Sequence, residues 1–158
     1  MNVEYIEPFV RAAYNVLELT IGSRPTKEQL SLRRNSFTTQ QLTILAGVNG
    51  DVEGSAMYGM SQATAQKIAG AMIGTEVLEM DEMAISAVSE LGNMITGNAT
   101  TLLSQKGMSV DITPPSIIRG IDVEVSTRTP ALVVPIMTDA GRIEINVAIA
   151  ENQLKKAA

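Results

Sequence analysis

The sequence predicts an α+β fold, a largely antiparallel sheet of five or six strands with helices packed against one face. Residues 2–21 and 82–105 repeat apolar residues every three or four positions, as one face of a helix does. Residues 42–60 and 142–150 instead alternate apolar with polar residues, as half-buried strands do. With 158 residues and 45% hydrophobic content, the chain can bury one sizeable core, so residues 1–158 are expected to form a single domain.

The first expected helix spans residues 2–21. Pro8 lies early in it, where a missing N–H costs little, and Gly22 and Pro25 end it. Residues 30–37 are then expected to form the first strand. The apolar face of the helix recurs at steps of three and four: Tyr5, Phe9, Ala12, Ala13, Val16, Leu17 and Thr20.

A hairpin is expected over residues 42–60. Asn49-Gly50 separates two alternating runs, and this dipeptide favours a type I′ turn because both central residues of that turn need a positive φ. A short helix follows from Ser61 to about Ile73, where Gly74 ends it. Residues 75–80 link it to the long helix at 82–105.

The C-terminal third is expected to return to strands. Pro114-Pro115 imposes an extended or turn geometry, and Pro135 places its strand near a sheet edge or a bulge. A hairpin turn is expected at residues 139–141, and the polar tail from Glu151 is expected to fray. The expected strands are 110–112, 121–128, 132–137 and 142–150.

Composition excludes several classes of function. Twelve basic and seventeen acidic residues give a net charge of −5, and the chain has no basic block that could neutralise the phosphates of nucleic acid or of an anionic membrane. The sequence contains no cysteine and no histidine. Disulfides, a thiolate nucleophile, a histidine general base and the common zinc sites are therefore excluded.

Nothing in the sequence predicts a membrane protein. No apolar run approaches the roughly 20 residues of a membrane span. The amino terminus carries the acidic residues Glu4 and Glu7 where a signal peptide would carry basic ones. A soluble, cytoplasmic protein is expected.

The long helix at 82–105 carries the candidate site. Asp81 can cap its N-terminus. On a helical wheel, one narrow sector holds the expected buried stripe, and a polar row lies roughly opposite, so that a carboxylate and a carboxamide project side by side. The buried stripe is Ala84, Val88, Leu91, Ile95, Ala99 and Leu102, and the polar row is Ser86, Glu90, Asn93, Gly97 and Thr101.

Two interpretations of this polar row stand side by side. Glu and Asn on the polar face of an amphipathic helix are most often simply solvated. However, the middle of this helix holds two asparagines and two glycines, at positions 93, 98, 92 and 97, and both residue types disfavour helix. Such local costs are expected where a site or a close contact dictates the residue.

The segment from Ser86 to Thr101 resembles the active helix of the CheC/CheX family of chemotaxis phosphatases. The family signature is Asp or Ser, three residues, Glu, two residues and Asn, which Ser86, Glu90 and Asn93 match. A proline follows some twenty-two residues later in the family. Here Pro115 follows Asn93 after twenty-one residues, one position early. The opening Asn-x-Glu-Tyr-Ile-x-Pro-Phe of the chain is also similar to the family.

The resemblance implies a CheC-like fold and one site in each chain. A second motif in the first helix would pair Asn15 with a Glu at position 12, which is Ala12, so the pattern is CheX-like. CheX-like proteins form homodimers through their sheets, and a homodimer is expected here. Apolar strands such as 143–149 would also be a liability as open edges of a monomer.

The resemblance further implies a protein phosphatase that accelerates hydrolysis of the aspartyl phosphate of a CheY-like response regulator. Asn93 would position the water, and Glu90 would dock on a lysine of the regulator. Ser86 occupies the Asp-or-Ser position, Gly97 permits close docking, and Asn98 either supports the site or ties the helix to the sheet. The protein would need no metal or cofactor of its own, because the partner regulator would supply Mg²⁺.

One alternative belongs to another class of function. The flagellar switch proteins are related to this family and use the same fold for assembly. The chain could therefore be a non-catalytic binding or scaffold module that binds response regulators or switch components without releasing phosphate.

Overall fold

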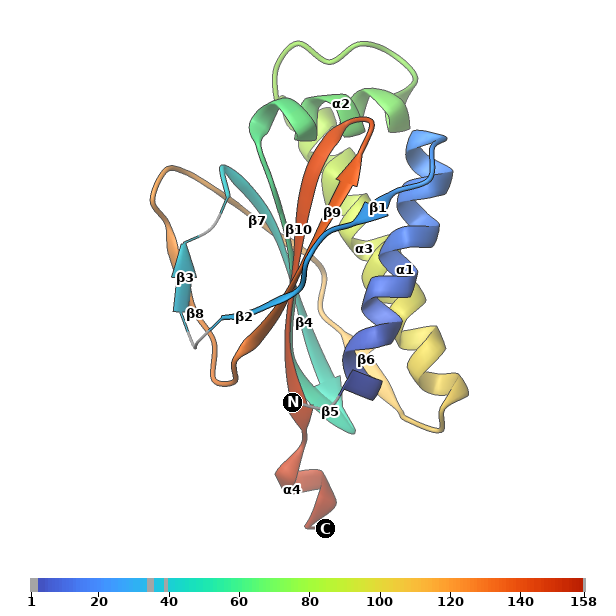
Figure 1. Cartoon of the computed structure of the whole chain (residues 1–158), viewed down its shortest axis with the longest axis vertical. Coiled ribbons are helices and arrows are strands. Elements are labelled where there is room, and N and C mark those ends of the chain that lie inside the picture. Colours follow the sequence, from blue (N-terminus) through green and yellow to red (C-terminus); the bar gives the residue numbers. More distant parts are fainter. Residues whose placement is uncertain (1–2, 34–35, 39, 158) are drawn as a thin grey trace.

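The computed structural model describes residues 3–33, 36–38 and 40–157. Its three longer helices lie together on one face of a twisted antiparallel sheet, which confirms the predicted α+β fold (Figure 1). The long helices α1 (Val3–Ile21) and α3 (Glu82–Gln105) run along the sheet, and α2 (Gln62–Ile73) lies across one end (Figure 1). Residue 2, the expected first residue of α1, lies outside the described residues.

The main sheet has eight strands, not the five or six predicted. The difference arises at its edges, where two short strands share one neighbour: β1 and β2 both pair with β9, and β6 and β7 both pair with β4. Its central order is β1-β9-β10-β5-β4-β6, and β3 and β8 form a separate pair. The strands are β1 (Thr26–Lys27), β2 (Ser31–Arg33), β3 (Ser36–Thr38), β4 (Leu42–Gly50), β5 (Val52–Met60), β6 (Val110–Ile112), β7 (Ser116–Arg119), β8 (Glu124–Ser126), β9 (Ala131–Thr138) and β10 (Gly141–Glu151).

The β4–β5 hairpin forms as predicted, but its turn does not lie at Asn49-Gly50. Val48 pairs with Gly54 and Ile44 with Tyr58, which centres the turn on Asp51. A two-residue turn at 49–50 would have placed the apolar residues of the two strands on opposite faces, and the hydrophobic pattern therefore decides the register. Ser109 stabilises this turn, because Asp51 Oδ2 accepts a hydrogen bond from its backbone N at 2.7 Å.

The core fills the space between the helices and the inner face of the sheet. Fully buried side chains of α1, α3 and the central strands form this core, including Phe9, Leu91 and Ile145. The apolar face of α1 is confirmed, since Phe9, Ala12, Ala13, Val16 and Leu17 are buried. Strand β10 lies between β9 and β5, so residues 143–149 are central in the sheet and leave no open edge that a homodimer would have to cover.

Two predicted strands differ from the structure. The expected strand at 30–37 is two short strands, β2 and β3, and residues 34–35 between them lie outside the described residues. Of the expected strand at 121–128, only residues 124–126 form a strand, β8. Asp122 takes a positive φ of 57°, which breaks an extended chain, and Ile121 is 84% exposed.

Pro135 lies in β9, next to the sheet edge and opposite a bulge, as predicted: residues 28–30 between β1 and β2 face residues 134–135. It pairs with Glu144 on the β10 side, and on the other side it falls between the residues that pair with β1 and those that pair with β2. The neighbouring strands are thus interrupted where proline offers no N–H. Its carbonyl still accepts a hydrogen bond from Glu28 N at 2.9 Å.

The tail does not fray from Glu151 as expected. Strand β10 continues through Glu151, and Asn152 caps a short helix, α4 (Gln153–Lys156). Asn152 also donates from its Nδ2 to Gly50 O at 3.0 Å, and Lys155 pairs with Asp51 at 3.1 Å. These contacts hold the tail on the β4–β5 turn, a long-range arrangement that polarity alone does not indicate.

Candidate active site

Helix α3 is positioned by its cap and by its buried stripe. Asp81 caps the N-terminus as predicted, accepting a hydrogen bond from Ala84 N at 2.9 Å on Oδ1. The stripe is confirmed except at its end, where Leu103 is buried and Leu102 only half-buried. Its buried residues are Ala84, Val88, Leu91, Gly92, Ile95, Thr96, Ala99 and Leu103.

The two glycines of α3 have different surroundings. A Cβ at Gly92 would lie 2.4 Å from Ile44 Cγ2, so the missing side chain lets the helix approach β4. A Cβ at Gly97 would meet nothing within 4 Å. No contact within the described chain therefore requires a glycine at position 97.

These surroundings predict opposite effects on stability from the same substitution. Gly97→Ala should stabilise the protein by about 0.5–1 kcal/mol, because alanine favours helix and the space is open. Gly92→Ala should destabilise it, because overpacking against Ile44 costs about 1–3 kcal/mol and outweighs the gain in helix propensity. Urea unfolding of the two variants and the wild type measures both effects, and equal shifts would contradict this packing of α3 on β4.

A buried hydrogen bond between α3 and the sheet was not predicted from the sequence. Tyr58 Oη lies 2.7 Å from Thr96 Oγ1, and Thr96 Oγ1 donates to Gly92 O at 2.8 Å. Burial raises the pKa of Tyr58 far above its ordinary value, so the phenol stays neutral and donates. The inward alternation of β5 places Tyr58 in the core, but only the packed fold pairs it with Thr96.

Ser86, Glu90 and Asn93 line one open groove on the exposed side of α3. The groove has a volume of about 480 Å³, and all three side chains are exposed. Its other wall comes from the segment between β6 and β7, with Thr113, Pro114 and Pro115. The structure thus brings three of the five predicted site residues together. Ile85, Ser89 and Ile112 complete the lining.

The other two predicted site residues lie outside this lining. Gly97 is half-buried one turn beyond Asn93, and Asn98 is exposed. The hydrogen bond that connects the middle of α3 to the sheet comes from Thr96 and not from Asn98. Sequence analysis named Pro115 as the proline of the motif and Pro114-Pro115 as extended, but it predicted no wall opposite α3 and missed Thr113. The position of this wall depends on strand pairing far from α3.

The groove presents one negative charge. Among the described residues that line it, Glu90 alone is charged, and no ion pair within the described chain involves it. An exposed carboxylate with no cation of its own attracts a cation from outside. Asn93 lies three residues further on the same helix face and offers both a donor and an acceptor.

Neither a metal site nor a membrane helix is found in the part of the chain that the structure describes. No three Asp or Glu side chains of those residues gather closely enough to hold a metal ion. Within the described ranges 3–33, 36–38 and 40–157, no helix is long and apolar enough to cross a membrane.

The fold places the chain in the class of CheC-like proteins. The family model "Chemotaxis phosphatase CheX" matches residues 42–137, and the chain belongs to the CheX family. It is therefore an enzyme, a hydrolase that acts as a phosphatase.

Three relatives illustrate the likeness. The chain is 32% identical to the CheY-P phosphatase CheX of Thermotoga maritima over 137 residues, which are 86% of this chain and 88% of the relative. It is also 32% identical to Borrelia burgdorferi CheX, whose structure was solved as a complex with CheY, BeF3 and Mg²⁺; that likeness covers 95% and 100% of the two chains with a TM-score of 0.76. A CheC-like superfamily protein of Shewanella sp. PV-4 has 25% identity over 95% of this chain and 99% of its own, with a TM-score of 0.85.

Proposed function

We propose that this protein, acting as one domain of residues 1–158 in the cytoplasm, accelerates hydrolysis of the aspartyl phosphate of a CheY-like response regulator. The observation that carries the proposal is the common groove of Ser86, Glu90 and Asn93 on an exposed helix of a CheX-family chain. The Thermotoga relative, a CheY-P phosphatase, and the Borrelia complex with CheY support the choice of partner.

Asn93 would act by position and not as a base. A carboxamide is not basic near neutral pH, but its oxygen accepts a hydrogen bond from water while its NH₂ donates to a phosphoryl oxygen. The water oxygen then attacks phosphorus in line, and the bond from phosphorus to the aspartyl oxygen breaks. Inorganic phosphate and a proton are released, and the regulator keeps its aspartate as a free carboxylate. Because an acyl phosphate is already activated, orientation of the water supplies the needed rate.

Glu90 would dock the helix. A second acid beside a phosphoryl group would repel it, whereas a lysine of the regulator resolves this conflict by pairing with the carboxylate. The exposed carboxylate and the absence of a cation in the described lining of the groove support this role. Glu90 is thus an anchor, and Asn93 is the residue that reaches the reacting atoms.

Three residues would support this pair. Ser86 lies in the groove one turn before Glu90 and can hydrogen-bond to the partner. Gly97 faces open space, which would let the partner's backbone come close, and Asn98 adds a polar group beyond it. The donor set of one carboxylate, one amide and hydroxyls does not fit a Mg²⁺ site of this chain, and we expect that ion to be held by the regulator.

The test is an assay of phosphate release. Purified protein is mixed with radiolabelled phosphorylated CheY-like regulators, and the loss of label is timed against the regulator alone. Acceleration of at least tenfold supports the proposal. Capture of regulators or flagellar switch components in a pull-down without faster loss of label would instead favour the non-catalytic binding module.

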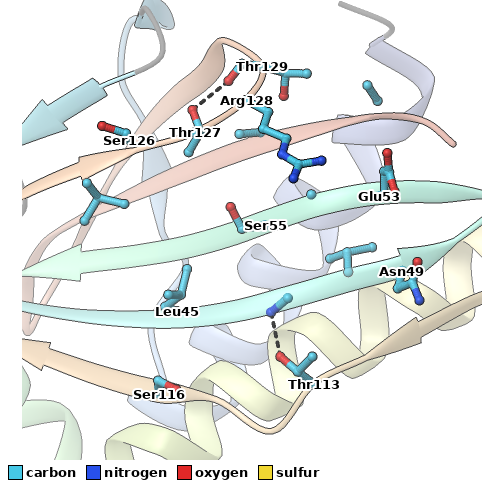
Figure 2. A pocket seen from close by; sticks show the side chains of 16 residues that line it. Leu45, Asn49, Glu53, Ser55, Thr113, Ser116, Ser126, Thr127, Arg128 and Thr129 are labelled. Atoms are coloured by element: carbon cyan, nitrogen blue, oxygen red, sulfur yellow. Dashed lines mark hydrogen bonds between the residues drawn. The ribbon is translucent and has the colours of Figure 1, made fainter. Parts of the chain in front are cut away.

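We also propose that the protein is a homodimer through the outer face of its sheet, the face away from the helices. That face carries a groove of about 550 Å³, which is open to a partner. The small apolar cluster of Met57, Ala131 and Ala148 beside it is already buried within the chain, where Val125 of β8 packs against it. Glu53 and Arg128 both line the groove (Figure 2), and in a two-fold dimer, where the same patch meets itself, such opposite charges could pair across the interface.

Ser55→Arg should convert the dimer to a monomer of 16.8 kDa, because it places a bulky charge on the floor of this outer groove. Sedimentation equilibrium measures the mass, with Ser104→Arg, an exposed position on α3, as the matched control. We expect the dissociation constant of the dimer to rise at least tenfold for Ser55→Arg alone, which corresponds to about 1.4 kcal/mol. A wild-type monomer would disprove the dimer.

A further inference from the structure

The wall of the active groove that faces α3 is built on a β-bulge. Val48 of β4 pairs with Ile112 of β6, and Leu45 of β4 pairs with Ser116 of β7. Two residues of β4, 46 and 47, therefore face three residues, 113–115, and the extra residue bends that segment out of the ladder. Bulges of this kind commonly re-aim side chains beside active sites. Here the bulge puts Pro114 and Pro115 on the groove.

Only one of the three bulge residues can be held through a backbone donor. Pro114 and Pro115 have no N–H, whereas Thr113 N donates to Gly47 O at 3.0 Å. The Thr113 side chain completes the contact, because its Oγ1 accepts a hydrogen bond from Gly47 N at 2.8 Å (Figure 2). Thr113 thus satisfies both backbone groups of Gly47.

Position 47 is shaped to receive this threonine. A Cβ there would lie 2.9 Å from Thr113 Oγ1 and 3.0 Å from its Cγ2. An alanine would therefore turn the Thr113 side chain away, and its hydroxyl could no longer accept from residue 47. The two hydrogen bonds between Thr113 and Gly47 therefore need the glycine as well as the threonine. We call this pair of contacts the Thr113–Gly47 clasp.

Resting on the proposed function, we propose that Thr113 is a positioning residue for the dephosphorylation reaction. Through the clasp it fixes the bulge, and the bulge holds the two prolines as a preformed wall opposite Glu90 and Asn93. A preformed wall lowers the entropic cost of seating the regulator, so the clasp acts on docking while Asn93 retains the water. Thr113 itself touches neither the water nor the phosphoryl group.

Thr113→Val keeps the shape of the side chain and removes the acceptor. We expect the KM for phosphorylated regulator to rise about tenfold while kcat stays within about twofold, because Asn93 is untouched. Thr113→Ser keeps the hydroxyl and should restore KM to within about twofold. Thr75→Val, the same change at an exposed threonine between α2 and α3, is the matched control and should leave both constants unchanged. Since Thr113 is exposed, we expect the melting temperature of Thr113→Val to fall by only about 2–4 °C.

Hydrogen exchange of the Gly47 amide tests the clasp without any partner. Exchange should be at least tenfold faster in Thr113→Val than in the wild type and in Thr113→Ser. Gly47→Ala should raise KM as Thr113→Val does, and the double variant should be no worse than the stronger single one, because both remove the same contact.

The outcomes separate this inference from the proposed function. Unchanged Gly47 exchange in Thr113→Val, or faster exchange with a wild-type KM, overturns the positioning role. A KM that stays high in Thr113→Ser does so as well, because the hydroxyl is then not what matters. If the wild-type chain itself accelerates no phosphate release, the proposed function fails, while the exchange result still decides whether the clasp exists.

Discussion

Asn93→Ala should lower the rate of stimulated dephosphorylation by at least a hundredfold at saturating protein. In the proposed mechanism its carboxamide holds the attacking water, and orientation can supply several of the roughly 7–11 kcal/mol available to positioning. A loss of about 3 kcal/mol is already more than a hundredfold in rate. Timed loss of label from a phosphorylated regulator measures this effect, with the spontaneous rate of the regulator alone as the floor.

Stability should not explain this loss. Asn93 is exposed on a helix, and alanine favours helix more, so the free energy of unfolding should be unchanged or slightly higher. Asn15→Ala, the same change at an exposed position of α1, provides the matched control and should retain full activity. Affinity for the regulator should fall at most severalfold in Asn93→Ala, because Glu90, the proposed docking residue, is unchanged. Full activity in this variant would end the proposed mechanism.

Features set by near neighbours in the chain were predictable. The Asp81 cap, the stripe of α3 and the row of Ser86, Glu90 and Asn93 follow from helical spacing within one segment, and the structure has them. The same holds for α2, which Ser61 caps and Gly74 ends with a positive φ of 88°. In each case the side chains that decide the structure lie within a few residues of one another.

Features that depend on contacts between distant segments of the chain could not be predicted from the sequence. Strand β7 follows directly after Pro114-Pro115. The two isoleucines among its four residues favour a strand, but the run is too short to identify one, and its place in the sheet depends on pairing of residues 116–119 with β4. The turn at Asp51 likewise depends on Ser109, and the ordered tail depends on the hydrogen bond from Asn152 to Gly50. In both cases the two partners lie far apart in the sequence. The groove shares this division, since its α3 wall is local and its proline wall is a product of sheet pairing.

Glu90→Lys should weaken binding of the regulator by about tenfold to a hundredfold, which corresponds to about 1.4–2.8 kcal/mol. In the proposed docking the wild-type carboxylate attracts a lysine of the partner, and the variant ammonium would repel it at the same place. Surface plasmon resonance with a BeF3-activated regulator measures the dissociation constant. Glu90→Gln should fall between the two, because it removes the attraction without adding repulsion.

Net charge alone must be separated from this local contact. Glu18→Lys on α1 changes the net charge from −5 to −3 as Glu90→Lys does, and Glu18 is exposed on a helix away from the groove. It should change the affinity by less than about twofold at physiological salt, where exposed charges beyond roughly 8 Å are screened. Glu90→Lys also places a cation close to the phosphoryl group, so the sign of its effect discriminates between two partners for Glu90. Weaker binding means that the lysine contact dominates, whereas tighter binding would mean that Glu90 faces the phosphoryl group and that its docking role is wrong.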